Sequence, residues 1–154
     1  MKLALYQPEI PQNVGTMIRL GSCLGVGIDI IDPCGFVWDD TRLKRAGMDY
    51  IDLATVTRHS CWDEFRHQAS SPPNPSRIIL LDTKATLDYW DFSFHCSDIL
   101  LVGQESCGVS DVVFDQCQYQ VKIPMVSNRR SLNVAVAASV VLGEAIRQTR
   151  FNNN

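Results

Sequence analysis

The sequence lacks the short motifs that identify several large enzyme classes. It contains no P-loop, no GxSxG and no HExxH motif, and the early glycines Gly21, Gly25 and Gly27 have the wrong spacing for a GxGxxG fingerprint. These absences disfavour a plain Rossmann dehydrogenase and a P-loop enzyme. Any ligand site must therefore be inferred from the arrangement of loops and not from one motif.

Long apolar runs are also missing. No stretch approaches the roughly 20 residues that a membrane span requires. The N-terminal residues MKLALYQPEIPQN lack the apolar region and the small-residue cleavage site of a signal peptide. We therefore expect a cytoplasmic protein with no membrane partner, and at 154 residues a single domain, 1–154.

The cysteines show neither metal-site nor disulfide spacing. No CxxC pair occurs, so we expect reduced thiols, several of them buried, and no bound metal. The six are Cys23, Cys34, Cys61, Cys96, Cys107 and Cys117. The net charge is only −3, so a nucleic-acid partner would have to be bound by local basic clusters.

Apolar periodicity predicts strands that alternate with helices. The expected strands are 2–6, 28–31, 50–56 (weakly), 77–81, 99–102 and 119–123, and the expected helices are 13–24, 40–46, 62–68, 111–114 and 132–149. Asn13, Ser131 and either Ser110 or Asp111 are candidate N-caps. This order predicts an α/β fold, with a parallel sheet and helices on both faces.

Ligands of such sheets bind beyond the carboxyl ends of the strands. Three loops are expected there, at 81–83, 103–108 and 123–131. Gly103 and Gly108 permit a close approach of backbone to a ligand. The basic loop 127–130 before Ser131 is typical of a helix start that binds a carboxylate or phosphate, or of an ordinary strand–loop–helix connection.

Three segments carry a resemblance to a known family. They are IPQNVG at 10–15 followed by Arg19, LVGQESCG at 101–108, and IPM at 123–125 with SLN at 131–133. Together they resemble the SPOUT class of RNA methyltransferases, in its ribose 2′-O-methyltransferase family. Asp32-Pro33, Gly35-Phe36 and LKRAGMDY at 43–50 resemble the subfamily that methylates the wobble ribose of tRNA. The resemblance covers nearly the whole chain.

The resemblance implies a carboxyl-terminal deep trefoil knot, the SPOUT fold, which periodicity alone does not predict. It implies S-adenosylmethionine as methyl donor and a homodimer with the active site at its interface. The implied reaction methylates a ribose 2′-hydroxyl of tRNA, at the wobble cytidine or uridine, with the anticodon stem-loop as partner.

The resemblance also implies roles for individual residues. Arg19 matches the catalytic arginine, and Asn13, Glu105 and Asn133 match polar positions near the substrate. The donor is expected at Leu81, Gly103, Ile123, Met125, Ser131 and Leu132. The residues alone, without the resemblance, favour a simpler interpretation: Asn13 as a helix cap, Glu105 as a surface turn residue and Arg19 as a solvated charge.

The sequence departs from the family pattern at several positions. Cys107 stands where relatives carry arginine, Ile51 replaces a histidine, and Gly143 and Ile146 replace aromatic residues of the last helix. A nucleophilic role for Cys107 is disfavoured, because no base is placed beside it and transfer to a ribose oxygen needs no covalent intermediate.

Other interpretations remain open. The basic residues form either an RNA-binding surface or solvated faces; they are Arg19, Arg42, Lys44, Arg45, Arg129 and Arg130. The alternatives in function are a ribosomal RNA ribose methyltransferase, a SAM- or RNA-binding module without catalysis, and an α/β enzyme that acts on small molecules.

Overall fold

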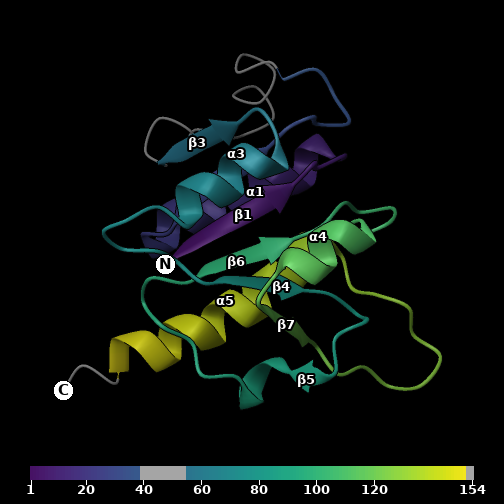
Figure 1. The fold of residues 1–154 in the computed structure, drawn as a ribbon. Helices are drawn as coiled ribbons and strands as arrows, with labels where there is room; N and C mark the ends of the chain where they lie inside the picture. Colours follow the sequence, from purple (N-terminus) through teal and green to yellow (C-terminus); the bar gives the residue numbers. More distant parts are fainter. Residues whose placement is uncertain (39–54, 152–154) are drawn as a thin grey trace.

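The computed structural model describes residues 1–38 and 55–151, which form a twisted parallel sheet flanked by helices (Figure 1). Within this part of the chain seven strands pair in the order β3-β2-β1-β6-β4-β7-β5, and every pairing is parallel. The strands are β1 (Lys2–Tyr6), β2 (Gly27–Ile31), β3 (Val56–His59), β4 (Ile78–Leu81), β5 (Leu87–Asp88), β6 (Ile99–Val102) and β7 (Tyr119–Lys122).

Helices cover both faces of the sheet (Figure 1). The helices are α1 (Pro11–Leu24), α3 (Trp62–Ala69), the 3₁₀ helix η2 (Tyr89–Asp91), α4 (Asp111–Gln116) and α5 (Val134–Phe151). Successive strand side chains point to opposite faces. Leu3 and Leu5 therefore pack with α1 and α5, whereas Ala4 and Tyr6 pack with α3 and α4. The expected α/β class, with a parallel sheet covered on both faces, is confirmed.

The strand order brings distant segments of the chain together. β6 pairs with β1 on one side and with β4 on the other, and β7 continues the sheet beyond β4. The carboxyl ends of these four strands therefore meet at one edge. The loops expected to bind a ligand follow three of them, β4, β6 and β7.

The start of α1 differs from the prediction. The helix begins at Pro11, with Ile10 at the N-cap position, and Asn13 is a buried residue of its first turn. Proline is favoured in the first turn because a backbone N–H at that place has no hydrogen-bond partner within the helix, so its absence costs nothing. The interpretation of Asn13 as the helix cap is therefore wrong. Gly25, with φ of 66°, ends the helix as expected.

The start of α5 differs as well. The helix begins at Val134, and the Asn133 side chain accepts hydrogen bonds from the backbone N–H groups of Ala135 and Val136. Ser131 is therefore not the cap of this helix; Asn133 is. At α4 the expectation holds, because the Ser110 side chain accepts from the N–H of Val113.

Some expectations lie outside the described residues, namely the helix at 40–46 and most of the strand at 50–56. The sequence does not predict β5 and η2, since two- and three-residue elements have no measurable periodicity.

Fewer cysteines are buried than expected: Cys117 is buried and Cys34 half-buried, whereas Cys23, Cys61, Cys96 and Cys107 are exposed. Within residues 1–38 and 55–151, no helix combines the length and apolarity needed to cross a bilayer.

Candidate functional site

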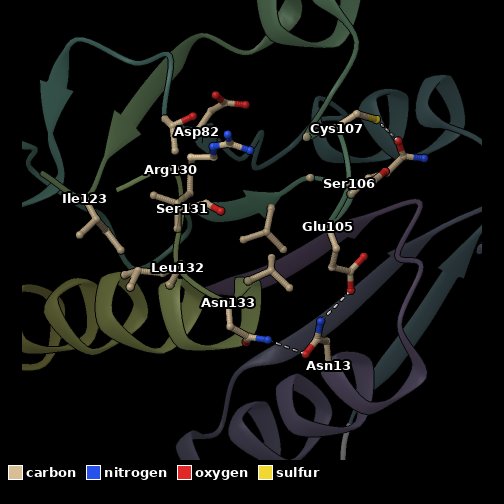
Figure 2. A pocket seen from close by; sticks show the side chains of 18 of the residues that line it. Asn13, Asp82, Glu105, Ser106, Cys107, Ile123, Arg130, Ser131, Leu132 and Asn133 are labelled. Carbon is tan, nitrogen blue, oxygen red and sulfur yellow. Dashed lines mark hydrogen bonds between the residues drawn. The ribbon is translucent and has the colours of Figure 1, made fainter. Parts of the chain in front are cut away.

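A pocket of about 640 Å³ lies at the carboxyl ends of β4, β6 and β7 (Figure 2). This volume falls in the range of small-molecule and cofactor sites. Its walls come from the three expected loops, from the first turns of α1 and from the start of α5. The predicted residues that line it are Asn13, Leu81, Gly103, Glu105, Ile123, Met125, Ser131, Leu132 and Asn133.

The pocket wall is apolar where the strands end. Leu81, Val102 and Ile123 come from the ends of three adjacent strands, and Leu132 and Ala137 close the wall from the side of α5. Such a surface suits a flat apolar group.

The loop after β6 is a tight turn that depends on two glycines. Gln104 and Gly108 exchange backbone hydrogen bonds of 2.8 and 3.0 Å, and Gly108 has a φ of +71°. A Cβ atom on Gly103 would lie only 2.5 Å from the carbonyl carbon of Gly108. The turn therefore has no room for a side chain at position 103, and Gly103 presents its bare backbone to the pocket.

Three polar side chains, one each from α1, the β6 loop and α5, form a connected row along the pocket wall (Figure 2). The Asn13 Nδ2 donates to Glu105 Oε1 at 3.0 Å, and the Asn133 Nδ2 donates to Asn13 Oδ1 at 3.0 Å. Asn133 also caps α5. Residues separated by 92 and 120 positions in the sequence are thus joined in one network.

Glu105 is anchored at the start of α1. Its carboxylate accepts from the backbone N–H of Glu9 at 2.8 Å and from that of Ile10 at 3.3 Å, in addition to Asn13. A helix N-terminus favours a negative charge at this place. Glu105 is therefore a half-buried turn residue, as its position in the sequence suggests, and its carboxylate in addition links two segments of the site.

Charged and thiol groups lie at the mouth of the pocket. Arg130 lines it, and Lys84 forms an exposed ion pair with Asp111 at 3.4 Å. The Cys107 thiol is exposed and donates to Gln104 Oε1 at 2.6 Å (Figure 2). In loop 32–38, outside the pocket lining, burial and the Asp32 carboxylate raise the pKa of the Cys34 thiol to about 12. Cys34 is therefore a protonated thiol at neutral pH.

The structure does not place Arg19 in this pocket. Arg19 lies on the exposed face of α1, six residues after Asn13, which corresponds to about 9 Å along the helix axis. Arg129 is exposed and is not among the lining residues. Arg42, Lys44, Arg45 and Ile51 fall outside the described residues.

Sequence reasoning missed parts of the site. Lys84 lies one residue beyond an expected loop, and Ala137 contributes from the second turn of α5. The small size of Ala137 at a pocket-facing helical position was an available signal. Glu9 holds the β6 loop from outside the pocket, and no local pattern reveals a contact between residues 97 positions apart. Among the described residues, no three His, Cys, Asp or Glu side chains gather closely enough to hold a metal ion.

Comparison with known proteins gives a consistent match over the chain. The model of the SpoU rRNA Methylase family matches residues 1–143. A tRNA (cytidine(34)-2′-O)-methyltransferase of Beijerinckia indica is 52% identical over 146 residues, which are 95% of this chain and 90% of that protein.

Two solved structures are similar to this one. A structure described as giving insights into the 2′-OH methylation of C/U34 on tRNA is 37% identical, with a TM-score of 0.87; the match covers 96% of this chain and 94% of that chain. The SpoU methyltransferase AviRb of Streptomyces viridochromogenes, in complex with AdoMet, is 28% identical, with a TM-score of 0.85. That match covers 100% of this chain and 59% of the AviRb chain.

Proposed function

Because the chain belongs to the SpoU rRNA Methylase family, we propose that it transfers a methyl group from S-adenosylmethionine to the ribose 2′-hydroxyl of nucleotide 34 of tRNA. Its fold is the SPOUT fold with its trefoil knot, as its structural neighbours imply. Nucleotide 34 is the wobble position of the anticodon, and cytidine is the base named for the relatives at 40–52% identity. We also propose that residues 1–154 form a single domain and that the protein acts in the cytoplasm.

One observation carries this proposal. Every residue assigned from the sequence to donor or substrate binding lines the same pocket, although these residues come from segments up to 120 positions apart. Arg19, the residue assigned to catalysis, lies outside it. A pocket that gathers all the residues assigned to donor and substrate binding is what the proposed reaction requires.

The pocket residues fit S-adenosylmethionine. Leu81, Ile123 and Leu132 would flank its adenine, and the backbone near Gly103 and Met125 would read the edge of the base. Gly103 lets the backbone of Gly108 lie where a Cβ atom would be, which keeps this turn compact at the pocket wall. When bound, the donor supplies a sulfonium methyl group that is already a good electrophile. The proposed transfer therefore invokes no metal.

The chain must align the ribose hydroxyl with this methyl group and stabilise the charge that develops on the hydroxyl oxygen. Asn13 and Asn133 stand at the pocket wall, with Glu105 between α1 and the β6 loop, and we assign these three residues to substrate positioning. A guanidinium suits the charge-stabilising role and also grips an adjacent phosphate, and we assign this role to Arg19.

The position of Arg19 supports a homodimer. α1 and α5 pack against each other, and the exposed face of α5 carries Val136, Val140 and Gly143 at helical spacing. Both valines belong to α5, and they are 51% and 40% exposed, although the opposite face of this helix is buried in the core. A second copy on this face would bury them and place the Arg19 of one subunit beside the pocket of the other. The anticodon stem-loop would then bind across both subunits, with Arg129 and Arg130 at the pocket mouth.

Nucleoside mass spectrometry of tRNA tests the reaction. tRNA from a strain that lacks the gene should lose the 2′-O-methyl group at nucleotide 34, and the restored gene should return it. Ribosomal RNA from the same strains is the control for the alternative target. Unchanged tRNA together with a missing ribosomal methyl group would overturn the tRNA assignment.

Two Arg19 variants test the catalytic assignment. Removing one preorganised donor to an oxyanion costs on the order of 3 kcal/mol, or a hundredfold or more in rate. Arg19→Ala should therefore lose most turnover and keep its affinity for the donor in calorimetry. Arg19→Lys keeps the positive charge but loses the planar guanidinium group with its paired N–H donors. This variant should retain weak activity with little change in the pH dependence of the rate. Full Arg19→Lys activity that returns only at high pH would instead indicate that residue 19 acts as a general base.

Light scattering at micromolar concentration tests the dimer. Wild-type protein should have the mass of two chains, and Val140→Glu should shift the equilibrium toward one chain. A wild-type monomer that is active on tRNA would contradict the proposal.

A further inference from the structure

The turn between β1 and α1 holds the β6 loop at three successive residues. Gln104 donates from Nε2 to Gln7 Oε1 at 3.1 Å, and the Glu105 carboxylate accepts from the backbone of Glu9 and Ile10. The third residue, Ser106, donates both its backbone N–H and its hydroxyl to Glu9, at 2.8 Å each. Every polar side chain from 104 to 106 is thus bonded to the segment 7–10.

Glu9 is the residue on which these contacts converge. Its side chain accepts from Ser106, and its backbone N–H donates to Glu105. Each glutamate carboxylate therefore bonds the segment that contains the other glutamate. Loop 32–38 lies against its backbone: the Gly35 N–H donates to Pro8 at 2.9 Å, and a Cβ on Gly35 would lie 3.0 Å from the Cα of Glu9. Glu9 itself is not among the residues that line the pocket.

We propose that Glu9 is a positioning residue for the methyl donor: by holding Ser106 it keeps the turn from Gly103 to Gly108 in the shape that binds S-adenosylmethionine. This proposal rests on the proposed function, because it takes the pocket to be the donor site. Glu9 acts through the β6 loop and touches neither donor nor RNA.

The physical reason lies in the way this turn is built. Gly103 and Gly108 allow the two ends of the turn to approach each other closely, but glycine residues also allow the turn to adopt many other conformations. The backbone bonds between Gln104 and Gly108 close the turn on itself and do not fix its direction relative to the sheet. The bonds of Gln104 and Glu105 to the segment 7–10 orient it, and the Glu9 carboxylate adds two charge-assisted bonds at Ser106. A donor that binds a turn populated in several conformations must select one of them, which lowers its apparent affinity.

The chain contains a matched control for this contact. At the start of α3, the Glu64 carboxylate likewise accepts from both the N–H and the hydroxyl of a serine, Ser60, although both bonds go to Oε2, whereas Ser106 bonds both oxygens of Glu9. Neither Glu64 nor Ser60 lines the pocket. Glu64→Ala therefore removes an equivalent pair of bonds remote from the donor site.

Calorimetry with S-adenosylmethionine and no RNA gives the first measurement. Loss of a charge-assisted hydrogen bond of about 1.4 kcal/mol corresponds to a tenfold change. Glu9→Ala should therefore bind the donor about tenfold more weakly, whereas Glu64→Ala should bind it as wild type does. Glu9→Gln keeps an acceptor and should recover most of the affinity. Ser106→Ala should weaken binding, and adding it to Glu9→Ala should cause little further loss, because both changes remove one contact.

Two further readouts separate positioning from general destabilisation. With tRNA as substrate, Glu9→Ala should raise the KM for the donor in parallel with Kd and leave kcat at saturating donor within about threefold. Hydrogen exchange of the ligand-free protein should accelerate at residues 103–108 in Glu9→Ala and stay unchanged there in Glu64→Ala. If Glu9→Ala does not fold, Ser106→Ala takes its place as the variant expected to lose donor affinity, and Glu64→Ala remains the control.

The outcomes distinguish the two proposals. Donor affinity and loop exchange in folded Glu9→Ala equal to wild type would overturn the positioning role and leave the proposed function standing. Absence of donor binding by the wild-type protein would overturn the proposed function, and the role of Glu9 toward the donor would fall with it.

Discussion

Asn133 shows how single side chains of this site serve two structures at once. Its Oδ1 accepts from the first N–H groups of α5, and its Nδ2 donates to Asn13 on α1. The same side chain therefore fixes where α5 begins and holds the wall of the pocket. Gly103 is constrained in a comparable way, since its missing Cβ is required by the backbone of Gly108.

Gly103→Ala should abolish donor binding without unfolding the protein. The new Cβ would overlap backbone atoms of Gly108, which cannot move aside as a flexible side chain does. The turn would have to open, and calorimetry should detect no S-adenosylmethionine binding at concentrations that saturate wild type. Gly27→Ala is the control, because its Cβ would meet nothing closer than 3.5 Å. Normal donor binding by Gly103→Ala would contradict this account of the turn.

Cys107→Ser should keep most of the methyl transfer activity. A serine hydroxyl can donate to Gln104 as the thiol does, and the proposed reaction forms no covalent bond to the enzyme. Transfer rates measured with tRNA and labelled donor should agree with wild type within about threefold. A folded Cys107→Ser protein without activity would show that the thiol has a chemical role.

At the scale of elements, α5 packs against α1 and against β6 of the sheet. One face of it is buried against the sheet and α1, through Ala138, Val141 and Leu142. Near its end, Arg150 donates to the carbonyl oxygen of Leu24 at 2.6 Å and so satisfies an acceptor at the C-terminus of α1. Its exposed stripe is the face that we propose for dimerisation.

The pair Glu144–Arg147 on α5 gives a pH-dependent contribution to stability. Hydrogen bonds from Arg147 and then Gln148 lower the pKa of Glu144 from 4.5 to about 2. A carboxylate with a lowered pKa in the folded state stabilises the protein fully above its unfolded pKa, and this stabilisation is lost as the pH falls toward the folded value.

Glu144→Gln should therefore be less stable than wild type at pH 6, by about 0.5 kcal/mol for an exposed helical pair. The difference in the free energy of unfolding should shrink between pH 4.5 and pH 2, which urea titrations at several pH values would measure. Asp63→Asn is the control, because Asp63 and Arg66 have the same spacing but lie 4.0 Å apart. A constant difference across this pH range would refute the assignment.

At the scale of the whole molecule, a buried ion pair joins the amino ends of the strands, opposite the pocket. Asp98 is 1% exposed and accepts from Nε and Nη2 of Arg77 at 2.7 and 2.6 Å. Arg77 also donates to the carbonyl oxygen of Ser93 and lies over the rings of Phe92 and Tyr119. This cluster fastens the segment between η2 and β6 to the start of β4.

Arg77→Met should destabilise the protein by about 3 kcal/mol, because it leaves the buried Asp98 carboxylate without its charged partner. Chemical denaturation would measure this loss. Arg66→Met, which removes an exposed arginine from a 4.0 Å pair, should change stability by less than about 0.5 kcal/mol. A loss below about 1 kcal/mol for Arg77→Met would show that water or another donor replaces the guanidinium.

The sequence by itself determined the fold class and most of the residues that line the candidate pocket. Strands such as 99–102 are short apolar runs between turn residues, and this local pattern needs no tertiary information. The loops at the strand ends followed from the same reasoning, and the family pattern identified the polar residues within them. The match of the family model to residues 1–143 confirms the resemblance.

Only the tertiary structure decided how these residues are joined. Asn13 looks like a helix cap in the sequence because its partners, Glu105 and Asn133, lie 92 and 120 residues away. Ser131 looks like the cap of α5, yet Asn133 takes that role while it also bonds Asn13. The contact between Glu9 and Ser106 has no local signal at all. Hydrogen bonds of this kind depend on which strand ends lie side by side, and strand order is set by packing over the whole chain.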